Sequence, residues 1–232
     1  TSATIHIELD DSNYLKDDIL KFALFADEHH VVVDAATIHD YPELIAWLED
    51  DTTEKNVYDA KKTYIVAHRL DISISNIIFD VMLASYIIDP SRAIDDVNSV
   101  VSNYGQHYVQ QSVEVYGKGK KRHLPEDGVL NHYVATVIEA INQVKPIMQE
   151  QLIEYNQTNL LDNLELPLAR ILSEMEETGI YTVSNDLKEM EKEIQSKLDV
   201  LRKNIHEAAG EPFNINSPKQ LGVVLFETLE LP

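Results

Sequence analysis

A single apolar stripe runs through residues 184–210 and constrains the fold of this chain more than any other sequence feature. Its members alternate steps of three and four residues, which places them on one side of a long α-helix: Leu187, Met190, Ile194, Leu198, Leu201, Ile205 and Ala208. Ser184 is suited to cap the start of this helix, and Gly210 is suited to end it. So narrow a stripe predicts packing along one partner helix, either the helix around residues 168–175 or a returning helix later in the polypeptide.

The order of the predicted elements divides the chain into two parts. Three strands are expected first, at residues 4–8, 19–26 and 30–34. Helical patterns follow at residues 41–49, 59–68, 77–88, 92–104 and 128–150, with the longest irregular stretch at 105–128. We therefore expect an α/β domain over residues 1–157 and an all-α segment with a long helix over residues 158–232, incomplete at Pro232.

The second part is expected to open with another amphipathic helix. Its stripe recurs at helical spacing, Gly179 can end the helix, and residues 180–183 form a short extended piece after it. The stripe consists of Leu164, Leu168, Ile171, Leu172 and Met175.

Composition restricts the classes of protein to which the chain can belong. A content of 44% hydrophobic and 25% charged residues is ordinary globular material. No apolar run approaches the length of a membrane span, and zero cysteines exclude disulfides and thiolate metal sites, which fits the reducing cytoplasm. The net charge of −21 argues against nucleic-acid binding by the whole surface. Lys118, Lys120, Lys121 and Arg122 nevertheless form a compact basic cluster, either a phosphate contact or a solvated loop.

A second well-marked helix start follows the long helix. Ser217 is a natural N-cap, Pro218 suits the first helical position, and Gln220 stands where it would close a capping box. Asn214 and Asn216 precede this cap, so free backbone N–H groups and two amides share one corner that suits phosphate oxygens. An ordinary capped helix accounts for the same residues.

Residues 213–217, Phe-Asn-Ile-Asn-Ser, closely resemble the thumb of bacterial family A DNA polymerases, the DNA polymerase I family. In that family this sequence lies against the backbone of the primer–template duplex. The resemblance implies that Asn214, Asn216 and Ser217 contact DNA, with Lys219 as a weaker candidate. It also implies a monomeric, cytoplasmic replication and repair polymerase that uses dNTP and Mg²⁺ at a site beyond Pro232. This segment itself would then hold no catalytic residue and no cofactor.

The first part resembles the ribonuclease-H-like 3′–5′ exonuclease domain of the same family, but it lacks most of the metal-binding carboxylates. The first motif, Asp-x-Glu, falls on residues 6–8 and keeps Glu8 while His6 replaces the aspartate. The aspartate of the second motif falls near Thr63. The third motif, Tyr-x-x-x-Asp, keeps Tyr133 and has Val137 in place of the aspartate. Imidazole, hydroxyl and isopropyl groups cannot hold two hard cations, so we expect a vestigial domain without exonuclease activity and without metal.

Two other classes of function remain open. An active nuclease with non-standard metal ligands would have to recruit Asp10, Asp11 or Asp59. A non-catalytic scaffold or binding module would use the α/β part only to pack against a partner. His29 and His30 lack a third zinc ligand at suitable spacing, which favours surface polar residues over a zinc site.

Overall fold

The computed structural model describes residues 2–92, 96–105 and 109–231, and the chain forms two compact units, Thr1–Gly179 and Ile180–Pro232. The boundary expected after residue 157 lies just beyond the end of a long helix, α6 (Asp127–Glu154), whereas the first compact unit continues to Gly179. Helix α8 (Leu166–Thr178) belongs to the first unit because it packs against α2 (Ala60–His68).

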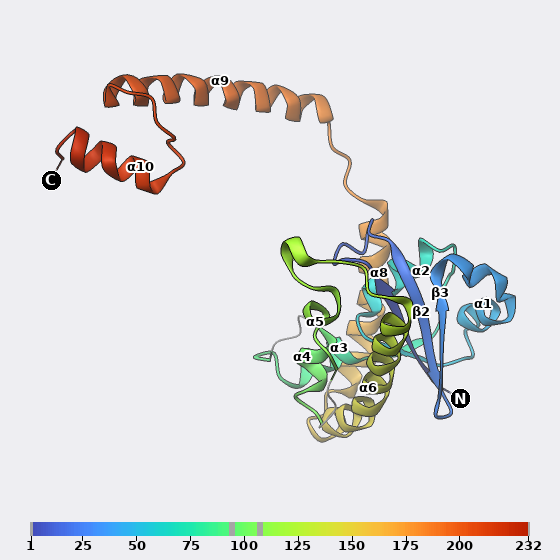
Figure 1. The fold of residues 1–232 in the computed structure, drawn as a ribbon. Helices are drawn as coiled ribbons and strands as arrows, with labels where there is room; N and C mark the ends of the chain where they lie inside the picture. The colour runs from blue at the N-terminus through green and yellow to red at the C-terminus, as the bar shows by residue number, and fades with distance from the viewer. Residues whose placement is uncertain (1, 93–95, 106–108, 232) are drawn as a thin grey trace. The chain divides into compact units, whose positions relative to one another are not determined.

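A mixed five-stranded sheet with the strand order β3-β2-β1-β4-β5 forms the centre of the first unit (Figure 1). The strands β1 (Ala3–Leu9), β2 (Ile19–Ala26) and β3 (His29–Asp34) form two consecutive antiparallel pairs. The short strands β4 (Lys55–Val57) and β5 (Ile77–Asp80) continue the sheet in parallel to β1. Strand β1 is therefore central and buried along almost its whole length.

Side chains alternate between the two faces of β1 and meet helices on both. The hydroxyl of Thr4 donates to Oδ1 of Asn142 at 3.2 Å, so the face that carries Thr4, His6 and Glu8 lies under α6. The other face points into the main apolar cluster, which contains Ile5, Ile7, Leu9, Ile38, Leu48 and Val66. The sequence therefore forms the α/β layers that were expected.

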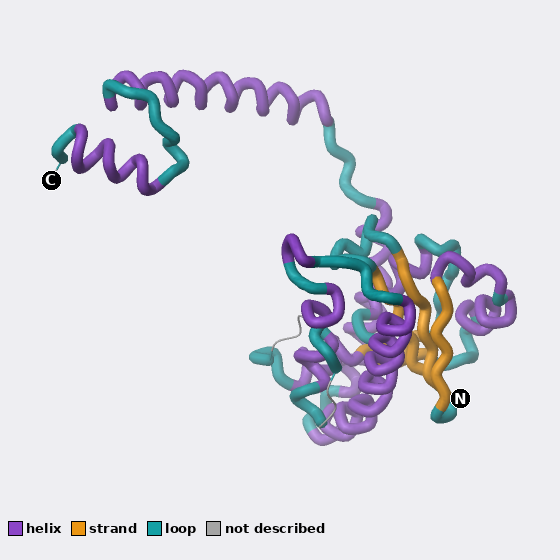
Figure 2. Tube along the Cα trace, viewed as in Figure 1, coloured by secondary structure: helices purple, strands orange, loops and turns teal. Residues whose placement is uncertain are grey.

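The remaining helical elements of the first unit are mostly short, and Figure 2 shows them around the strands. They are η1 (Ala35–Asp40), α1 (Pro42–Glu49), α3 (Val81–Ile88), α4 (Val97–Val101), α5 (Ser112–Tyr116), η2 (Gly119–Lys121), α7 (Thr158–Leu160) and η3 (Leu161–Glu165). None of the helices in the described part of the chain combines the length and the apolar content that a membrane span requires.

Two expectations about the elements of this unit were wrong, and one strand was not expected at all. Residues 77–88 are not one helix, because residues 77–80 pair with β4 as β5 and Asp80 then caps α3. Strand β4 was missed, since three residues including a lysine carry no strand pattern. The helix expected at residues 92–104 is only α4, and residues 93–95 lie outside the described residues.

The second unit consists of α9 (Ser184–Ala209), α10 (Pro218–Val223) and the π-helical turn η4 (Val224–Thr228). Gly210 ends α9 in the left-handed conformation, with φ 76°, as expected. The expected cap is one residue off, because Val183 is the N-cap and Ser184 already belongs to the helix.

The expectation that the α9 stripe is buried does not hold within this unit. Leu187, Ile194 and Leu201 are 56%, 53% and 55% exposed, and Ala209 is the one buried residue among those described in α9. The reason is that residues 180–231 contain no second helix of comparable length to cover it. A partner helix elsewhere in a longer polypeptide stays a prediction.

Candidate functional site

The residues at the expected first and third motifs gather around one cavity of about 320 Å³. His6 and Glu8 reach it from β1, and Tyr133 and Val137 reach it from α6. The polar lining also includes Asp10, Asp11, Lys62, Asp96, Tyr116 and Arg122. The structure therefore brings together residues that lie far apart in the sequence, as the resemblance implied.

Both carboxylate oxygens of Glu8 are bound by neighbouring side chains. Nε2 of His6 lies 2.7 Å from Oε2, and the hydroxyl of Tyr116 donates to Oε1 at 2.7 Å. Burial acts to raise the pKa of Glu8, but the hydrogen bonds from His6 and Tyr116 and the imidazole charge outweigh it and leave this pKa below its ordinary value. Burial and the neighbouring Glu8 together raise the pKa of the Tyr116 phenol.

Arg122 closes this cavity from the loop that follows α5. Its guanidinium pairs with Asp10 at 3.0 Å and with Asp11 at 3.7 Å, and lies 5.3 Å from the centre of the Tyr116 ring. The loop can turn back because Gly117 adopts φ 76°, and a Cβ there would lie 2.5 Å from the carbonyl oxygen of Lys121. Of the basic cluster, Arg122 is thus engaged with acidic residues of the same unit.

The other expected positions have clear structural roles. Tyr133 packs edge-on against Tyr116, with ring centres 6.3 Å apart, and Val137 is buried in the cavity wall. Thr63 does not line the cavity, because it is buried in α2 and its hydroxyl donates to the carbonyl oxygen of Asp59 at 2.8 Å. Lys62 of the same helix lines the cavity instead.

The residues around the cavity do not fit a pair of divalent cations. Across the described ranges, no three His, Cys, Asp or Glu side chains are grouped as a metal site would require. Asp10 and Asp11 face Arg122, and Asp59 caps α2 by accepting from the backbone N–H of Lys62 at 2.9 Å. Two donors already bind the carboxylate oxygens of Glu8. A cation at this site would have to displace them and would lie near positively charged side chains.

A buried carboxylate that sequence reasoning missed holds the starts of two helices. Asp80 accepts from the backbone N–H groups of Asp59 and Ala60 at α2, at 3.1 and 2.6 Å, and from those of Met82 and Leu83 at α3, at 2.8 and 3.2 Å. Burial raises the pKa of Asp80 to about 6 although these donors act to lower it. Its role here is to hold the two helices together.

A separate corner in the second unit carries the expected DNA-contacting residues. Oγ of Ser217 accepts from the backbone N–H of Gln220 at 3.4 Å, which confirms the N-cap of α10. The expected capping box is wrong, because Oε1 of Gln220 accepts from the N–H of Asn214 at 2.8 Å instead of reaching Ser217. Asn214, Asn216 and Lys219 are exposed beside this cap.

This corner is fastened to the end of α9. Nε2 of His206 lies 3.0 Å from the carbonyl oxygen of Phe213, and the two rings pack with centres 5.6 Å apart. Oδ1 of Asn214 accepts from the N–H of Asn216 at 3.1 Å, so the turn is locally braced. The amides are thus presented on an ordered turn.

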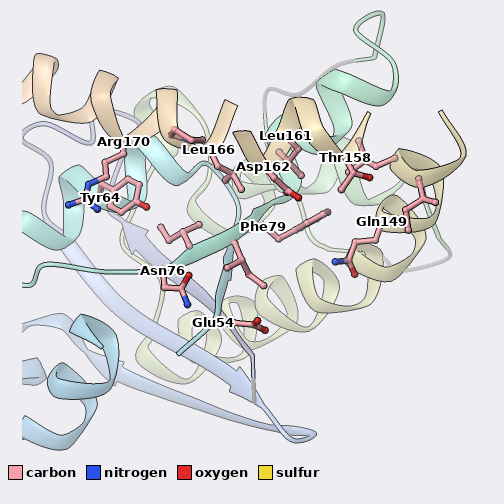
Figure 3. Close-up of a pocket in the computed structure, with 15 residues that line it drawn as sticks. Glu54, Tyr64, Asn76, Phe79, Gln149, Thr158, Leu161, Asp162, Leu166 and Arg170 are labelled. Carbon is pink, nitrogen blue, oxygen red and sulfur yellow. The ribbon is translucent and has the colours of Figure 1, made fainter. Parts of the chain in front are cut away.

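A larger cavity of about 700 Å³ lies elsewhere in the first unit (Figure 3). Its floor is apolar and includes Phe79 of β5, Leu161 of η3 and Leu166 of α8. Tyr64 and Arg170 lie next to each other at one end in Figure 3. No residue of the expected sites lines it.

The sheet and the residues around Glu8 define the first unit as a ribonuclease-H-like α/β domain of the kind found in exonucleases. Comparison with protein families agrees: residues 5–144 match the model for the DNA polymerase I ribonuclease H-like domain, and residues 184–232 match DNA polymerase family A. The chain belongs to the family A, DNA polymerase I family. The two matches leave residues 145–183 between them, so the boundary at residue 157 stays a prediction.

Individual relatives point the same way. The chain is 39% identical over 220 residues to DNA polymerase I of Bacillus subtilis (strain 168), a match that covers 95% of this chain and 25% of that protein. It is 35% identical over 230 residues to DNA polymerase I of Geobacillus stearothermophilus, covering 99% of this chain and 26% of that protein. The chain therefore spans about a quarter of the length of these relatives.

A solved structure shares the fold. It is described as the POL domain of Pol1 from M. smegmatis in complex with DNA primer–template and dNTP, and it matches with a TM-score of 0.73 at 22% sequence identity. The match covers 99% of this chain and 37% of that chain.

Proposed function

We propose that this chain is the exonuclease-like domain and the start of the thumb of a DNA-directed DNA polymerase. The complete protein would join dNTPs to a primer as the template directs, by attack of the primer 3′-hydroxyl on the α-phosphate with Mg²⁺, as a cytoplasmic monomer in replication and repair. The matches of residues 5–144 and 184–232 to the DNA polymerase I and family A models support this proposal, as does the polymerase that shares the fold. The catalytic residues of synthesis would lie outside these 232 residues.

We propose that the first unit does not hydrolyse DNA. The observation that carries this is the environment of Glu8, whose two oxygens accept hydrogen bonds from His6 and Tyr116. Two-metal hydrolysis needs free carboxylate oxygens on both cations, and His6, Thr63 and Val137 supply none. Recruitment of Asp10, Asp11 or Asp59 is disfavoured by the arginine and backbone groups that already bind them.

Nuclease activity is tested directly with a 5′-labelled single strand and the purified chain in Mg²⁺ or Mn²⁺. We expect the strand to keep its length. Metal-dependent shortening that disappears in Glu8→Ala would refute the proposal, and so would shortening that persists in Glu8→Ala but disappears when Asp10, Asp11 or Asp59 is replaced by alanine.

We propose that Asn214, Asn216 and Ser217 contact the phosphate backbone of primer–template DNA, with Lys219 in a lesser role. Neutral amides, a hydroxyl and helix N-terminal N–H groups bind phosphate without reading bases, which suits an enzyme that copies any sequence. The exposure of both asparagines beside the cap of α10 supports this assignment. The net charge of −21 predicts weak DNA binding by the 232-residue chain alone.

The test replaces Asn214 and Asn216 together by alanine in a complete polymerase that contains this region. Losing two hydrogen bonds of about 0.5–1.5 kcal/mol each should weaken primer–template affinity roughly ten-fold or more, evenly across sequences. Because the groups are neutral, the salt dependence of binding should stay nearly constant, whereas Lys219→Ala should reduce it. Unchanged affinity and processivity in the double variant would show that Asn214 and Asn216 do not contact the DNA backbone.

A further inference from the structure

Helix α8 has two different faces. One face packs on α2 and buries Leu166, Ala169 and Ser173. The other face carries the stripe found in the sequence, and it is exposed instead of buried: Leu164 of η3 by 54%, Leu168 by 38%, Ile171 by 53%, Leu172 by 39% and Met175 by 62%. These residues recur at steps of three and four, so they form one continuous apolar strip along the helix.

Polar contacts fix the C-terminal end of α8 to the exonuclease-like unit. Nζ of Lys61 in α2 donates to the Glu176 carboxylate and to the hydroxyl of Tyr14, and that hydroxyl donates to Oε2 of Glu176 at 2.7 Å. Nδ1 of His68 lies 2.9 Å from Oε1 of Glu177. The helix therefore cannot rotate its apolar strip inward without breaking contacts that join it to the β1–β2 connection and to α2.

Burial disfavours the charged forms of Lys61 and Glu176, but the contacts between these residues and Tyr14 favour the charged forms more strongly. Hydrogen bonds from Lys61 and Tyr14 keep the pKa of Glu176 below its ordinary value, and the contacts with Glu176 and Tyr14 raise the pKa of Lys61. The side chains are 28% and 33% exposed, so solvent screens the pair only in part. This pair gives α8 a defined orientation on α2.

We propose that the exposed strip of α8 packs against the polymerase domain. The part in contact is the polypeptide that follows, in full-length relatives, the region that this chain matches. Three observations favour this occupant. The match to the polymerase family begins at residue 184, directly beyond α8, and the relatives are about four times longer than this chain. Contiguous exposed apolar residues often mark interaction surfaces. A second copy of the chain would bring together two bodies of net charge −21, which repel each other.

The exonuclease-like unit would then have a role without catalysis, because it orients the helix against which the polymerase domain packs. This role relies on the proposed function only for the existence of the complete polymerase. The labelling test measures how far the strip is covered and involves no DNA. The strip can therefore prove uncovered while Asn214 and Asn216 contact DNA, and Asn214 and Asn216 can fail to contact DNA while the strip is covered.

Because the 232 residues contain no cysteine, thiol labelling can report on single positions. Ile171→Cys and Met175→Cys lie on the strip, and Glu174→Cys lies off it on the same helix. Each is placed in the 232-residue chain and in a complete polymerase cleared of other cysteines, and the rate of reaction with a water-soluble maleimide is measured. We expect the strip cysteines to react at least about ten-fold more slowly in the complete polymerase than in the chain, with a smaller change at Glu174→Cys.

Equal rates at the strip positions in the two proteins would overturn the proposal. So would slow labelling in the 232-residue chain that becomes fast on dilution, since a second copy would then be the occupant. Lys61→Glu should speed labelling at Met175→Cys in the complete polymerase, and the further change Glu176→Lys should restore slow labelling. If the single charge reversal changes nothing, α2 does not orient α8.

Discussion

The hydroxyl of Tyr116 donates to Oε1 of Glu8 at 2.7 Å across 108 residues of sequence. This contact joins the end of α5 to the central strand β1. Glu8 is 9% and Tyr116 is 4% exposed, so little solvent reaches this contact. The bond therefore belongs to the core of the first unit, and its loss has a defined cost.

Tyr116→Phe should lower the free energy of unfolding by about 1–3 kcal/mol, because it leaves a buried carboxylate oxygen without its donor. Urea denaturation at pH 7 measures this loss. Tyr155→Phe is the matched control, since Tyr155 is 51% exposed, and it should change stability little. Equal midpoints for the wild type and Tyr116→Phe would show that this bond contributes nothing.

Gly117→Ala should displace the loop that carries Arg122. The new Cβ would stand 2.5 Å from a backbone oxygen and the residue would have to keep φ 76°, at a cost of about 1–3 kcal/mol. Gly119→Ala separates the two effects, because Gly119 has φ 58° but no atom within 4 Å of the added Cβ. Thermal unfolding should rank Gly117→Ala clearly below Gly119→Ala, and the reverse order would contradict the steric argument.

Leu198→Asp should change stability little in the 232-residue chain and strongly in a complete polymerase. Leu198 is 41% exposed here, so in the 232-residue chain the change should stay within about 0.5 kcal/mol, similar to Val200→Asp off the stripe. In a complete polymerase, where we expect a partner helix on the stripe, Leu198→Asp should cost several kcal/mol while Val200→Asp does not. Circular dichroism melts of both variants in both proteins decide this, and equal melting in the complete polymerase would rule out the partner helix.

Asp80 should titrate near pH 6 in the folded protein, whereas an unfolded chain would titrate it near 3.8. The folded state then binds this proton more tightly, so the Asp80 contribution to stability increases as pH falls from about 6 to about 4, by up to roughly 3 kcal/mol. Carboxyl carbon NMR measures the titration, and Asp80→Asn identifies the resonance. A midpoint near 4 would mean that the four backbone donors outweigh burial.

Local patterns predicted those parts of the fold whose residues carry their own periodicity. Residues 19–26 form β2 with the expected bounds, and the helix from residue 184 to 209 ends at Gly210. Residues 77–80 were misassigned because an unbroken apolar run suits a buried parallel strand as well as a helix. The stripe of α8 was predicted, but its exposure was not, because periodicity identifies an apolar face without saying what covers it.

The candidate site shows the same limit. Resemblance to family motifs indicated His6, Glu8, Tyr133 and Val137, and these residues do surround one cavity. Tyr116 and Lys62 were not found as members, because no local spacing connects them with Glu8. Thr63 was misplaced relative to the cavity, since an ungapped alignment cannot tell which side of α2 turns toward it.

The two donors that hold Glu8 also determine what would follow from introducing metal-binding carboxylates at positions 6 and 137. An aspartate restored at position 6 would remove one donor and set a second negative charge beside Glu8. One restored at position 137 would be buried in an apolar wall, since Val137 is 1% exposed. Each aspartate alone would add an unpaired negative charge without completing a metal site, so a two-metal centre at this cavity would require several simultaneous substitutions.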